Sequence, residues 1–353
     1  MDNSSTPGYC CLSTMGTTNG EILGFDGLNY DPERVAIVKS IVKARYDSLL
    51  AGNKIADNIK VFVKQEPHKL AKLEQNKERL ISAVSLVDTF VDRIIWGWLA
   101  RACLSNVART PCLVGWSPVR GDWRPFSELY ANKPVLCLDK SSWDWTVRGW
   151  MVEAFNEFVK NLCVNAPPFI YQLMDARMEL LFRDAVFQFE DGTVVQQCTH
   201  GIMKSGCFLT ILMNSVCQSL IHYIANIRLG LPPAQNEPRV IGDDTVQLGF
   251  PHVREYVEKI EQLGPVVKGA KIRHHVEFAG FAFADGVCYP AYWQKHLFNM
   301  AHSPNLVETL LSYQYLYVHE PVMYAFITRV AAEIGPHAIL PRLVALDIMD
   351  NPR

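Results

Sequence analysis

Apolar residues recur along much of the chain at the spacing of amphipathic helices. Residues 32–50 show this spacing and end near Gly52, and residues 253–263 show it again. A mainly apolar stretch that opens at Ser205-Gly206 and runs to about Arg228 predicts a further helix. The other predicted helices cover residues 85–104, two parts of 152–181 separated at Pro167-Pro168, and the chain from about residue 291 onward.

Short runs of β-prone residues between these helices predict strands. Residues 185–198 predict a hairpin that turns at Asp191-Gly192, and further strands are expected up to Tyr289. With 353 residues, of which 49% are hydrophobic and 20% charged, the chain can bury a sizeable core and is not expected to be disordered. Its ten cysteines include no Cys-x-x-Cys pair, which predicts small core residues in a reducing compartment rather than a zinc site.

Two adjacent carboxylates stand at a glycine turn between short runs of strand-forming residues, in Val240-Ile241-Gly242-Asp243-Asp244-Thr245-Val246. This pattern predicts a β-hairpin with acidic side chains at its tip. Carboxylate oxygens are ligands for hard cations such as Mg²⁺, so the hairpin is suited to hold the metals of a phosphoryl-transfer enzyme. Asp beside Gly is also common in ordinary turns, and the assignment therefore depends on residues upstream.

An apolar, β-prone run at residues 134–138 ends at Asp139. A buried strand that delivers an acid at its end places a metal ligand on a rigid element. Asp139 and Asp243 would then face each other across adjacent strands and share two cations. The alternative is that Asp139 caps the helix that follows, since Asp is a favoured N-cap residue.

Thr210 and Asn214 are polar residues on the predicted helix that opens at Ser205-Gly206. They are four residues apart and so share one face. Buried polar side chains need partners, and either a nucleotide sugar or a core hydrogen bond would serve. The helix has too many polar residues for a membrane span, and no other segment qualifies as one.

Basic residues gather where a strand at residues 61–63 runs into a loop that leads to a second strand near residue 80. Lys64, Lys69 and Arg79 suit the binding of a triphosphate, for which the arginine offers a planar fork. A solvated charged loop is the alternative, because glutamates such as Glu66 are interleaved with the basic residues.

In this order the segments resemble the motifs of RNA-dependent RNA polymerases of positive-strand RNA viruses. The amino-acid sequences of the motifs are most similar to those of sobemovirus-like (solemovirus- and barnavirus-related) polymerases. The resemblance covers most of the chain, and several motifs in the right order are far more specific than any one of them. The motifs are Ser4-Ser5-Thr6-Pro7-Gly8-Tyr9 (G), Lys64 to Arg79 (F), Asp139-x4-Asp144 (A), Ser205-Gly206-x3-Thr210-x3-Asn214 (B), Gly242-Asp243-Asp244 (C), Gly264-Pro265-Val266-Val267-Lys268 (D) and Val276-Glu277-Phe278-Ala279-Gly280-Phe281 (E).

The resemblance implies an α+β fold, that of a right-hand palm polymerase with fingers, palm and thumb and an antiparallel palm sheet backed by helices. The implied domains are residues 1–133 (partial fingers with motifs G and F, and a palm helix), 134–150 (palm motif A), 151–200 (a fingers insertion), 201–290 (palm motifs B to E) and 291–353 (a short thumb).

By the same resemblance the protein would be an RNA-directed RNA polymerase, a nucleotidyltransferase of viral genome replication and transcription. The 3′-hydroxyl of RNA would attack the α-phosphate of a ribonucleoside triphosphate in a two-metal-ion reaction. Asp139 and Asp243 would be the principal ligands of two Mg²⁺ or Mn²⁺ ions, with Asp244 in support. Lys268 would donate a proton to pyrophosphate, and Lys271 is a close rival for that role.

The resemblance also implies contacts to the nucleotide. Asp144 and Asn214 would form a hydrogen-bond network around the ribose 2′-hydroxyl, joined by Thr210 or Ser205. The basic loop would neutralise the triphosphate. The full implied nucleotide-binding set is Lys64, Lys69, Arg79, Asp144, Ser205, Gly206, Thr210 and Asn214.

The implied partners are the RNA template, the nascent RNA, ribonucleoside triphosphates and other viral replicase proteins. Those other proteins would link the chain to membrane-associated replication complexes in the host cytoplasm, since it has no membrane span of its own. A formal net charge of −2 is unusual for a nucleic-acid enzyme, but only an enclosed channel has to be positive. The chain begins almost at motif G and its thumb is short, so a polyprotein segment or a shortened chain is as much expected as a complete enzyme.

Two other functions stay open. A reverse transcriptase or a related palm polymerase is disfavoured by Asp144 and Asn214, and by glycine rather than an aromatic pair before Asp243. A fragment that no longer polymerises and serves as an RNA-binding or replicase-assembly module is disfavoured by the intact acids and favoured by the missing N-terminal fingers.

Overall fold

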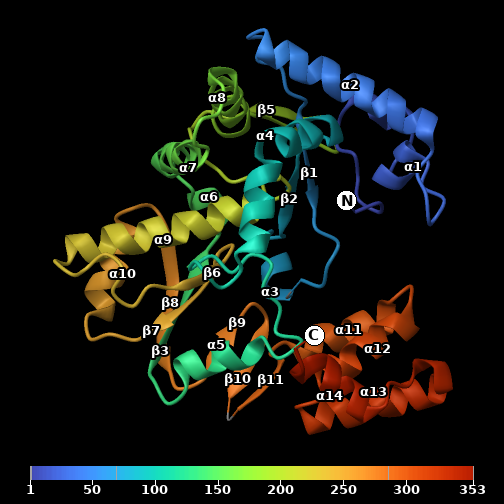
Figure 1. The fold of residues 1–353 in the computed structure, drawn as a ribbon, viewed down its shortest axis with the longest axis vertical. Coiled ribbons are helices and arrows are strands. Elements are labelled where there is room, and N and C mark those ends of the chain that lie inside the picture. Colours follow the sequence, from blue (N-terminus) through green and yellow to red (C-terminus); the bar gives the residue numbers. More distant parts are fainter. Residues whose placement is uncertain (1, 69, 285, 353) are drawn as a thin grey trace. The chain divides into compact units, whose positions relative to one another are not determined.

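The computed structural model describes residues 2–68, 70–284 and 286–352, and helices and short strands alternate along them (Figure 1). The helices are α1 (Asn19–Leu23), α2 (Pro32–Leu50), α3 (Leu70–Leu73), α4 (Leu86–Ser105), α5 (Trp123–Tyr130), α6 (Trp143–Thr146), α7 (Gly149–Leu162), α8 (Pro168–Phe182), α9 (Thr210–Arg228), α10 (Val253–Glu261), α11 (Trp293–His302), α12 (Leu306–Leu316), α13 (Pro321–Ile334) and α14 (Arg342–Asp350), with 3₁₀ turns at Cys11–Thr14 and Pro336–Ala338. The strands are β1 (Ile59–Val63), β2 (Leu80–Ala83), β3 (Val135–Ser141), β4 (Val186–Phe189), β5 (Val194–Gln196), β6 (Arg239–Ile241), β7 (Asp244–Leu248), β8 (Val266–Arg273), β9 (Val276–Phe278), β10 (Phe281–Ala284) and β11 (Val287–Pro290).

The chain divides into two compact units, each built from separate stretches of sequence. The first unit comprises Met1–Ser105, Ser141–Cys217 and Gly264–Val266. The second unit comprises Asn106–Lys140, Gln218–Leu263 and Val267–Arg353. The two acids of motif A therefore belong to different units: Asp139 to the second and Asp144 to the first.

The long helices of the first unit form where the apolar spacing predicts them. Helix α2 begins at Pro32, whose fixed backbone suits a first helical turn, and the Asp31 side chain caps it by accepting from the main-chain N–H groups of Glu33 and Arg34. Helices α7 and α8 are separated at the predicted proline pair, and Pro168 opens α8. The predicted helices at residues 32–50, 85–104 and 152–181 are thus confirmed to within a few residues.

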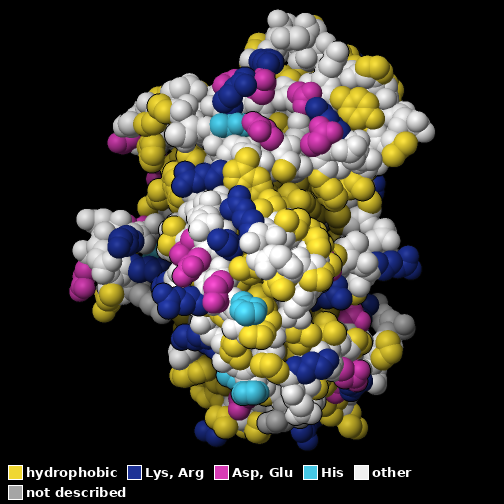
Figure 2. Space-filling model, turned by 90° about the vertical axis from the view of Figure 1, so that its left-hand side faces the viewer, with side chains coloured by type: hydrophobic (Ala, Val, Ile, Leu, Met, Phe, Trp, Pro, Cys, Tyr) yellow, Lys and Arg dark blue, Asp and Glu magenta, His cyan; other side chains and the backbone are white. Residues whose placement is uncertain are grey.

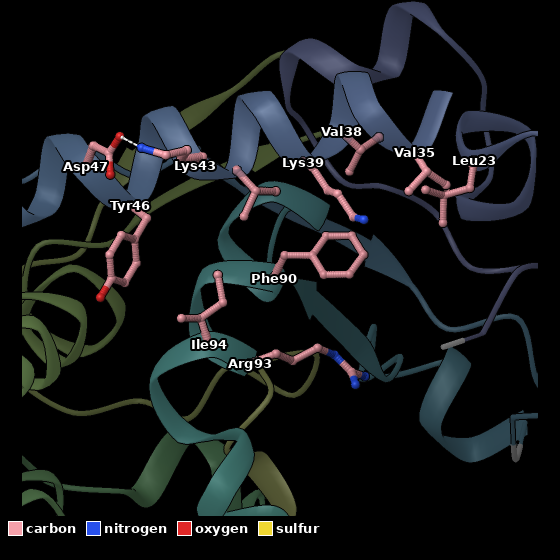
Figure 3. Close-up of a pocket in the computed structure, with 11 residues that line it drawn as sticks. Leu23, Val35, Val38, Lys39, Lys43, Tyr46, Asp47, Phe90, Arg93 and Ile94 are labelled. Atoms are coloured by element: carbon pink, nitrogen blue, oxygen red, sulfur yellow. Dashed lines mark hydrogen bonds and ion pairs between the residues drawn. The ribbon is translucent and has the colours of Figure 1, made fainter. Parts of the chain in front are cut away.

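A groove of about 700 Å³ runs between α2 and α4 (Figure 3). Its walls are mainly apolar, and Figure 3 shows Lys39 reaching from α2 toward Phe90 on α4. Among the described residues that line the groove, Asp47 is the one carboxylate, and it forms an ion pair with Lys43 at 2.5 Å.

The first unit has a four-stranded sheet in the order β2-β1-β4-β5. Strands β4 and β5 pair antiparallel, which confirms the hairpin predicted at residues 185–198, and Gly192 in its turn has a φ of 87°. Strands β1 and β4 pair in parallel, so this sheet is mixed. The pairing joins residues more than 120 positions apart, which local sequence patterns do not indicate.

Buried charges link α4 and α8 in the same unit. Arg177, which is 0% exposed, donates from Nε and Nη2 to the two carboxylate oxygens of Asp92 at 2.7 and 3.2 Å. Its Nη1 lies 3.5 Å from Asp88, which also accepts from Arg45 at 2.6 Å. Arg45 continues to Asp57 at 2.9 Å. The network lies in the interior, where charges must be paired to be tolerated.

The second unit contains a four-stranded sheet in the order β6-β7-β3-β8 and a three-stranded sheet in the order β11-β10-β9. The β3–β7, β6–β7, β9–β10 and β10–β11 pairs are all antiparallel. Helix α5 covers the small sheet, where Phe126 stacks on Phe278 with ring centroids 5.1 Å apart (Figure 1). The Tyr130 hydroxyl at the end of the helix donates to the carbonyl of Val246 on β7.

The chain beyond residue 291 is helical, as predicted, and α11, α12 and α13 share one apolar cluster that includes Leu310, Tyr317, Ile327 and Ala331. The buried residues of α14, Ala345 and Met349, belong instead to the cluster that includes Trp123 and Phe126. Gln314 is also buried there, and its amide bridges α12 to the following 3₁₀ turn by donating to the Ala338 carbonyl at 2.8 Å. Among residues 2–68, 70–284 and 286–352, we find no helix with both the length and the apolar character to cross a lipid bilayer.

Candidate active site

The acidic hairpin forms in the second unit as predicted. Strands β6 and β7 pair antiparallel, with Ile241 opposite Asp244, so Gly242 and Asp243 make a two-residue turn. Gly242 has a φ of 61°. Residues with a Cβ rarely adopt this backbone angle, but hairpin turns often require it at this position. Glycine thus closes the turn and leaves Asp243 at its tip.

Asp139 lies on β3, beside β7, in the same sheet. The β3–β7 ladder includes Leu136 opposite Gln247 and Cys137 opposite Val246. Continuing this register by two residues brings Asp139 level with Asp244, and side chains at opposed positions lie close together. The expectation that Asp139 faces Asp243 across adjacent strands is thus corrected, because Asp243 stands in the turn before β7. The alternative that Asp139 caps a helix is wrong, because α6 begins four residues later with Ser142 as its N-cap.

Lys140, on β3 directly after Asp139, lies near these acids. Its ammonium group donates to the Thr245 hydroxyl at 3.4 Å. Burial lowers the pKa of Lys140 to about 8. The carboxylates of Asp243, Asp244 and Asp139 act in the opposite direction, because they favour the charged form of the lysine. The lysine is therefore close enough to all three acids to compensate part of their charge.

The pKa of Asp244 is raised in turn. Desolvation of its carboxyl is the main cause, the neighbouring carboxylates of Asp243 and Asp139 add to it, and Lys140 opposes it. The three acids therefore repel one another electrostatically, and such mutual repulsion is what a bound cation relieves.

Lys268 on β8 reaches the same place. Its Nζ lies 3.6 Å from Asp139 Oδ2, and both side chains are largely exposed, so the ion pair itself adds little stability. Lys271 is three residues further along the strand, and side chains alternate between faces with a period of two. Lys271 therefore points to the opposite face, and the geometry favours Lys268 for a role beside Asp139.

The chemistry of these donors fits hard divalent cations, which prefer carboxylate oxygens. Within the described ranges, no three Asp, Glu, His or Cys side chains come close enough together to surround an ion. Mg²⁺ is usually held by one or two protein carboxylates together with substrate phosphates and water, rather than by a complete protein cage. An open set of acids, with Asp139 on β3, Asp244 on β7 and Asp243 in the turn before β7, fits that mode of binding.

The implied sugar-binding residues lie in the first unit. Asp144 is on the single-turn helix α6, and its main-chain carbonyl accepts from the N–H of Met203 at 2.8 Å. The next bond, from Ile202 N–H to the Val147 carbonyl at 2.9 Å, continues this pairing. Two backbone bonds thus attach the Asp144 segment to the loop that leads to Ser205.

Ser205 and Gly206 are attached to β2. The Ser205 hydroxyl accepts from Ser82 N–H at 3.0 Å, and Gly206 N–H donates to the Ser82 carbonyl at 3.0 Å. A Cβ on residue 206 would lie 2.9 Å from that carbonyl oxygen, so the close approach requires glycine. The Thr210 hydroxyl contacts the carbonyls of Lys204 and Cys207 at 2.7 and 2.8 Å. The hydroxyls of Ser205 and Thr210 both support the loop itself.

Asn214 is buried, with 4% of its surface exposed, one turn after Thr210 on α9. Its Oδ1 accepts no hydrogen bond from any described residue. A buried carbonyl oxygen without a donor is costly, so this atom is suited to accept from a bound ligand.

The positive charge of the basic loop between β1 and β2 is partly neutralised by a glutamate of the same loop. Lys64 Nζ lies 2.9 Å from one carboxylate oxygen of Glu66, and Arg79 Nη1 lies 3.4 Å from the other. Two residues predicted to bind the triphosphate, Lys64 and Arg79, therefore both contact Glu66. Lys69, the third, lies outside the described residues.

Motifs G and E also form ordered structure. In the N-terminal segment the Pro7 carbonyl accepts from Leu86 N–H at 2.8 Å, and the Tyr9 hydroxyl reaches the Phe189 carbonyl at 3.5 Å. In motif E, β9 and β10 form an antiparallel pair in which Phe278 lies opposite Phe281.

Charges of both signs are interspersed on the face shown in Figure 2, with apolar side chains between them. This agrees with the formal net charge of −2 and shows no broad cationic field on that face.

Sequence reasoning missed two lysines that are not fully exposed. Lys140 is half-buried and lies near the acids of the hairpin, and Lys204 lies in the loop before Ser205 with 0% of its surface exposed. The available signal was local: each lysine directly precedes or follows a motif residue, and Lys204 stands in the mainly apolar run from Gly201 to Asn214.

Comparison with known proteins identifies the family. The family model described as "Viral RNA-dependent RNA polymerase" matches residues 35–262, which include the hairpin, β3 and the loop of Ser205. The chain is 30% identical over 259 residues to the "Replicase polyprotein P2AB" of Southern bean mosaic virus, covering 69% of the chain and 25% of that protein.

Two further relatives extend the match. The chain is 26% identical over 325 residues to the "RNA-directed RNA polymerase" of Mushroom bacilliform virus, covering 86% of the chain and 76% of that protein. It is 28% identical over 272 residues to "Protein P1-P2" of Potato leafroll virus, covering 71% of the chain and 24% of that protein. The chain thus spans about a quarter of the Southern bean mosaic virus and Potato leafroll virus proteins, and the resemblance inferred from its motifs is confirmed. By the family model and these relatives alike, the chain belongs to the viral RNA-dependent RNA polymerases.

Proposed function

We propose that the chain is the catalytic region of a right-hand palm polymerase that synthesises RNA on an RNA template, for viral genome replication and transcription. The observation that carries this proposal is the group of three acids at one sheet, two on the neighbouring strands β3 and β7 and one in the β6–β7 turn, with Lys268 beside Asp139. The family match supports the same activity. The fingers would comprise residues 1–133 and 151–200. The palm would comprise residues 134–150 and 201–290, and the thumb residues 291–353.

Asp139 and Asp243 would hold two Mg²⁺ or Mn²⁺ ions, and Asp244 would support them. When bound, these ions would lower the charge repulsion around the reacting phosphates and activate the attacking 3′-hydroxyl. Lys268 would give a proton to the leaving pyrophosphate. The chain's part in such a transfer is mainly positioning and charge neutralisation, which dominate phosphoryl transfer.

Lys64 and Arg79, with Lys69, would bind the triphosphate, and Glu66 would hold the first two in place until the phosphates arrive. Asp144 and Asn214 would recognise the ribose 2′-hydroxyl. Asn214 supports this role because its buried Oδ1 has no donor among the described residues. Other viral replicase proteins would bring the chain to membrane-associated complexes in the host cytoplasm.

The test is extension of an RNA primer on an RNA template by the purified chain with ribonucleotides and Mg²⁺. We expect products whose sequence follows the template, none in EDTA, and little with deoxyribonucleotides. Products made equally well from deoxyribonucleotides on the same template would favour a reverse-transcriptase-like enzyme. A folded protein that binds RNA but extends nothing would instead be an RNA-binding or assembly module.

Asp144→Ala tests the sugar site separately from the metal site. The variant should still extend RNA, but its preference for ribonucleotides over deoxyribonucleotides should fall by about 10- to 100-fold, the scale of one lost hydrogen bond to a charged group. The measurement is kcat/KM for each sugar. Asp184→Ala, which removes an exposed acid of the same unit, is the matched control and should keep the wild-type preference.

A further inference from the structure

Lys204 lies inside the first unit with 0% of its surface exposed, and its ammonium group has three hydrogen-bond partners. Nζ donates to Gln197 Oε1, to the Ile202 carbonyl at 2.8 Å and to the Gly201 carbonyl at 3.3 Å. An ammonium group has three N–H donors, so the charged form matches the three acceptors one to one. A neutral amine has two, and would leave one acceptor without a donor.

Two of these acceptors belong to a strained turn. Gly201 has a φ of 127°, and a Cβ there would lie 2.2 Å from the Val147 carbonyl oxygen. Ile202 has a φ of 55°, a left-handed conformation that a β-branched residue rarely adopts. Such strain persists only where surrounding contacts hold it in place, and Lys204 contacts both carbonyls of the strained pair.

The strained turn in turn holds the Asp144 segment. Ile202 N–H donates to the Val147 carbonyl and Met203 N–H to the Asp144 carbonyl. On its other side, the Lys204 carbonyl accepts from the Thr210 hydroxyl at 2.7 Å. Lys204 therefore lies at the centre of a continuous set of bonds that runs from α6 to the start of α9.

No carboxylate of the described chain contributes a charge effect to Lys204. Nζ lies over the rings of Phe182 and Phe187, with centroids at 5.4 and 5.2 Å. Cys207 is the one titratable neighbour that acts on it, and burial raises the pKa of that thiol to about 11, so it is neutral. His200 in the same loop faces Glu153 instead. Burial lowers the pKa of Lys204 to about 7.

We propose that Lys204 is a positioning residue for sugar selection: its charged ammonium group holds the Gly201–Ile202 turn, and through it the Asp144 segment, in the conformation that recognises the ribose 2′-hydroxyl. The inference rests on the proposed function of Asp144. Loss of the Lys204 proton releases one carbonyl of the turn and loosens the segment, so sugar selection becomes dependent on pH. In this local change the side chain stays buried, unlike in global unfolding, which exposes it to water.

The first test compares the kcat/KM ratio of ribonucleotides to deoxyribonucleotides at pH 6, 7 and 8.5. In the wild type the ratio should fall about tenfold from pH 6 to 8.5, the effect of one hydrogen bond. Lys204→Met should have a low ratio that does not change with pH, whereas Lys204→Arg, which stays charged, should keep a high ratio at pH 8.5. Lys43→Met, which alters an exposed lysine, is the control and should follow the wild type. Equal pH profiles in the wild type and Lys204→Met would overturn the proposal.

The second test does not require polymerase activity. Amide hydrogen exchange at Ile202 and Met203 reports the two bonds to the Asp144 segment. After correction for intrinsic exchange, their protection in the wild type should decrease from pH 6 to 8.5, and in Lys204→Met it should be low throughout. If this holds while no RNA is made, the positioning role stands and the proposed function fails. Equal protection in both proteins at every pH would overturn the role of Lys204 whatever the activity.

Thermal melting checks the protonation itself. The pKa of Lys204 in the folded protein, about 7, lies below its ordinary value of 10.5. Between these values the unfolded chain binds more protons, so the stability of the wild type should rise with pH from about 7 to 10.5 relative to Lys204→Met. A difference between the two proteins that stays constant across this range would show that Lys204 does not titrate there, and would overturn the pH dependence.

Discussion

Asp243→Asn is expected to abolish RNA synthesis and to leave the protein folded. Asparagine has the shape of aspartate and fits the same two-residue turn, but it removes one negative charge from the tip of the hairpin. Loss of one preorganised electrostatic group commonly lowers kcat by about 10²- to 10³-fold, and a metal ligand should be at the upper end of that range. The measurement is single-nucleotide extension at saturating Mg²⁺.

The folded state of Asp243→Asn should be at least as stable as that of the wild type. Asp243 and Asp139 both raise the pKa of Asp244, so removing one charge relieves repulsion among the acids. The melting temperature without metal should therefore be unchanged or slightly higher, and added Mg²⁺ should raise it less than in the wild type. Asp122→Asn, at an exposed position whose side chain makes no cap hydrogen bond, is the matched control and should extend RNA normally. Equal extension by Asp243→Asn and the wild type would exclude Asp243 as a metal ligand.

The acidic hairpin could be predicted because it depends on short-range patterns. A glycine turn between two β-prone runs defines it, and the alternation of a strand fixes which side chains share a face. That β7 pairs with β3, so that Asp139 is level with Asp244 while Asp243 stands in the turn, could not be predicted from such patterns. The contact between Lys268 and Asp139 could not be predicted either, because it depends on β8 pairing beside β3, which joins residues far apart in the chain.

The buried cations could not be predicted for a related reason. Lysine and arginine are usually exposed, and a sequence does not show which of them enters the interior. Lys204 is buried against Phe182 and Phe187, which come from other parts of the sequence, and Lys140 is half-buried. The same holds for the hydroxyls of Ser205 and Thr210: helical spacing places Thr210 on the face of Asn214, but the loop carbonyls that it contacts exist only in the folded chain.

Arg177→Met is expected to destabilise the protein by about 3–5 kcal/mol, the cost of breaking a buried ion pair from one side. Methionine fills a similar volume, so the loss comes from charge: Asp92 and Asp88, both at most 1% exposed, would lose the guanidinium that they share. Arg45 would still neutralise Asp88, whereas Asp92 would be left without a cation. The measurement is denaturant unfolding followed by circular dichroism.

The effect of Arg177→Met should depend on pH in a defined direction. Burial already raises the pKa of Asp92, and Arg177 is what opposes that rise. Without the arginine Asp92 takes up a proton more readily, so the destabilisation should be smaller at pH 5 than at pH 8. Adding Asp92→Leu to Arg177→Met should restore part of the lost stability, since an apolar pair of similar volume leaves no buried charge. Arg183→Met, near the end of the same helix but exposed, should have little effect. A pH-independent loss that the second substitution fails to reduce would mean that Arg177 stabilises the first unit by packing alone.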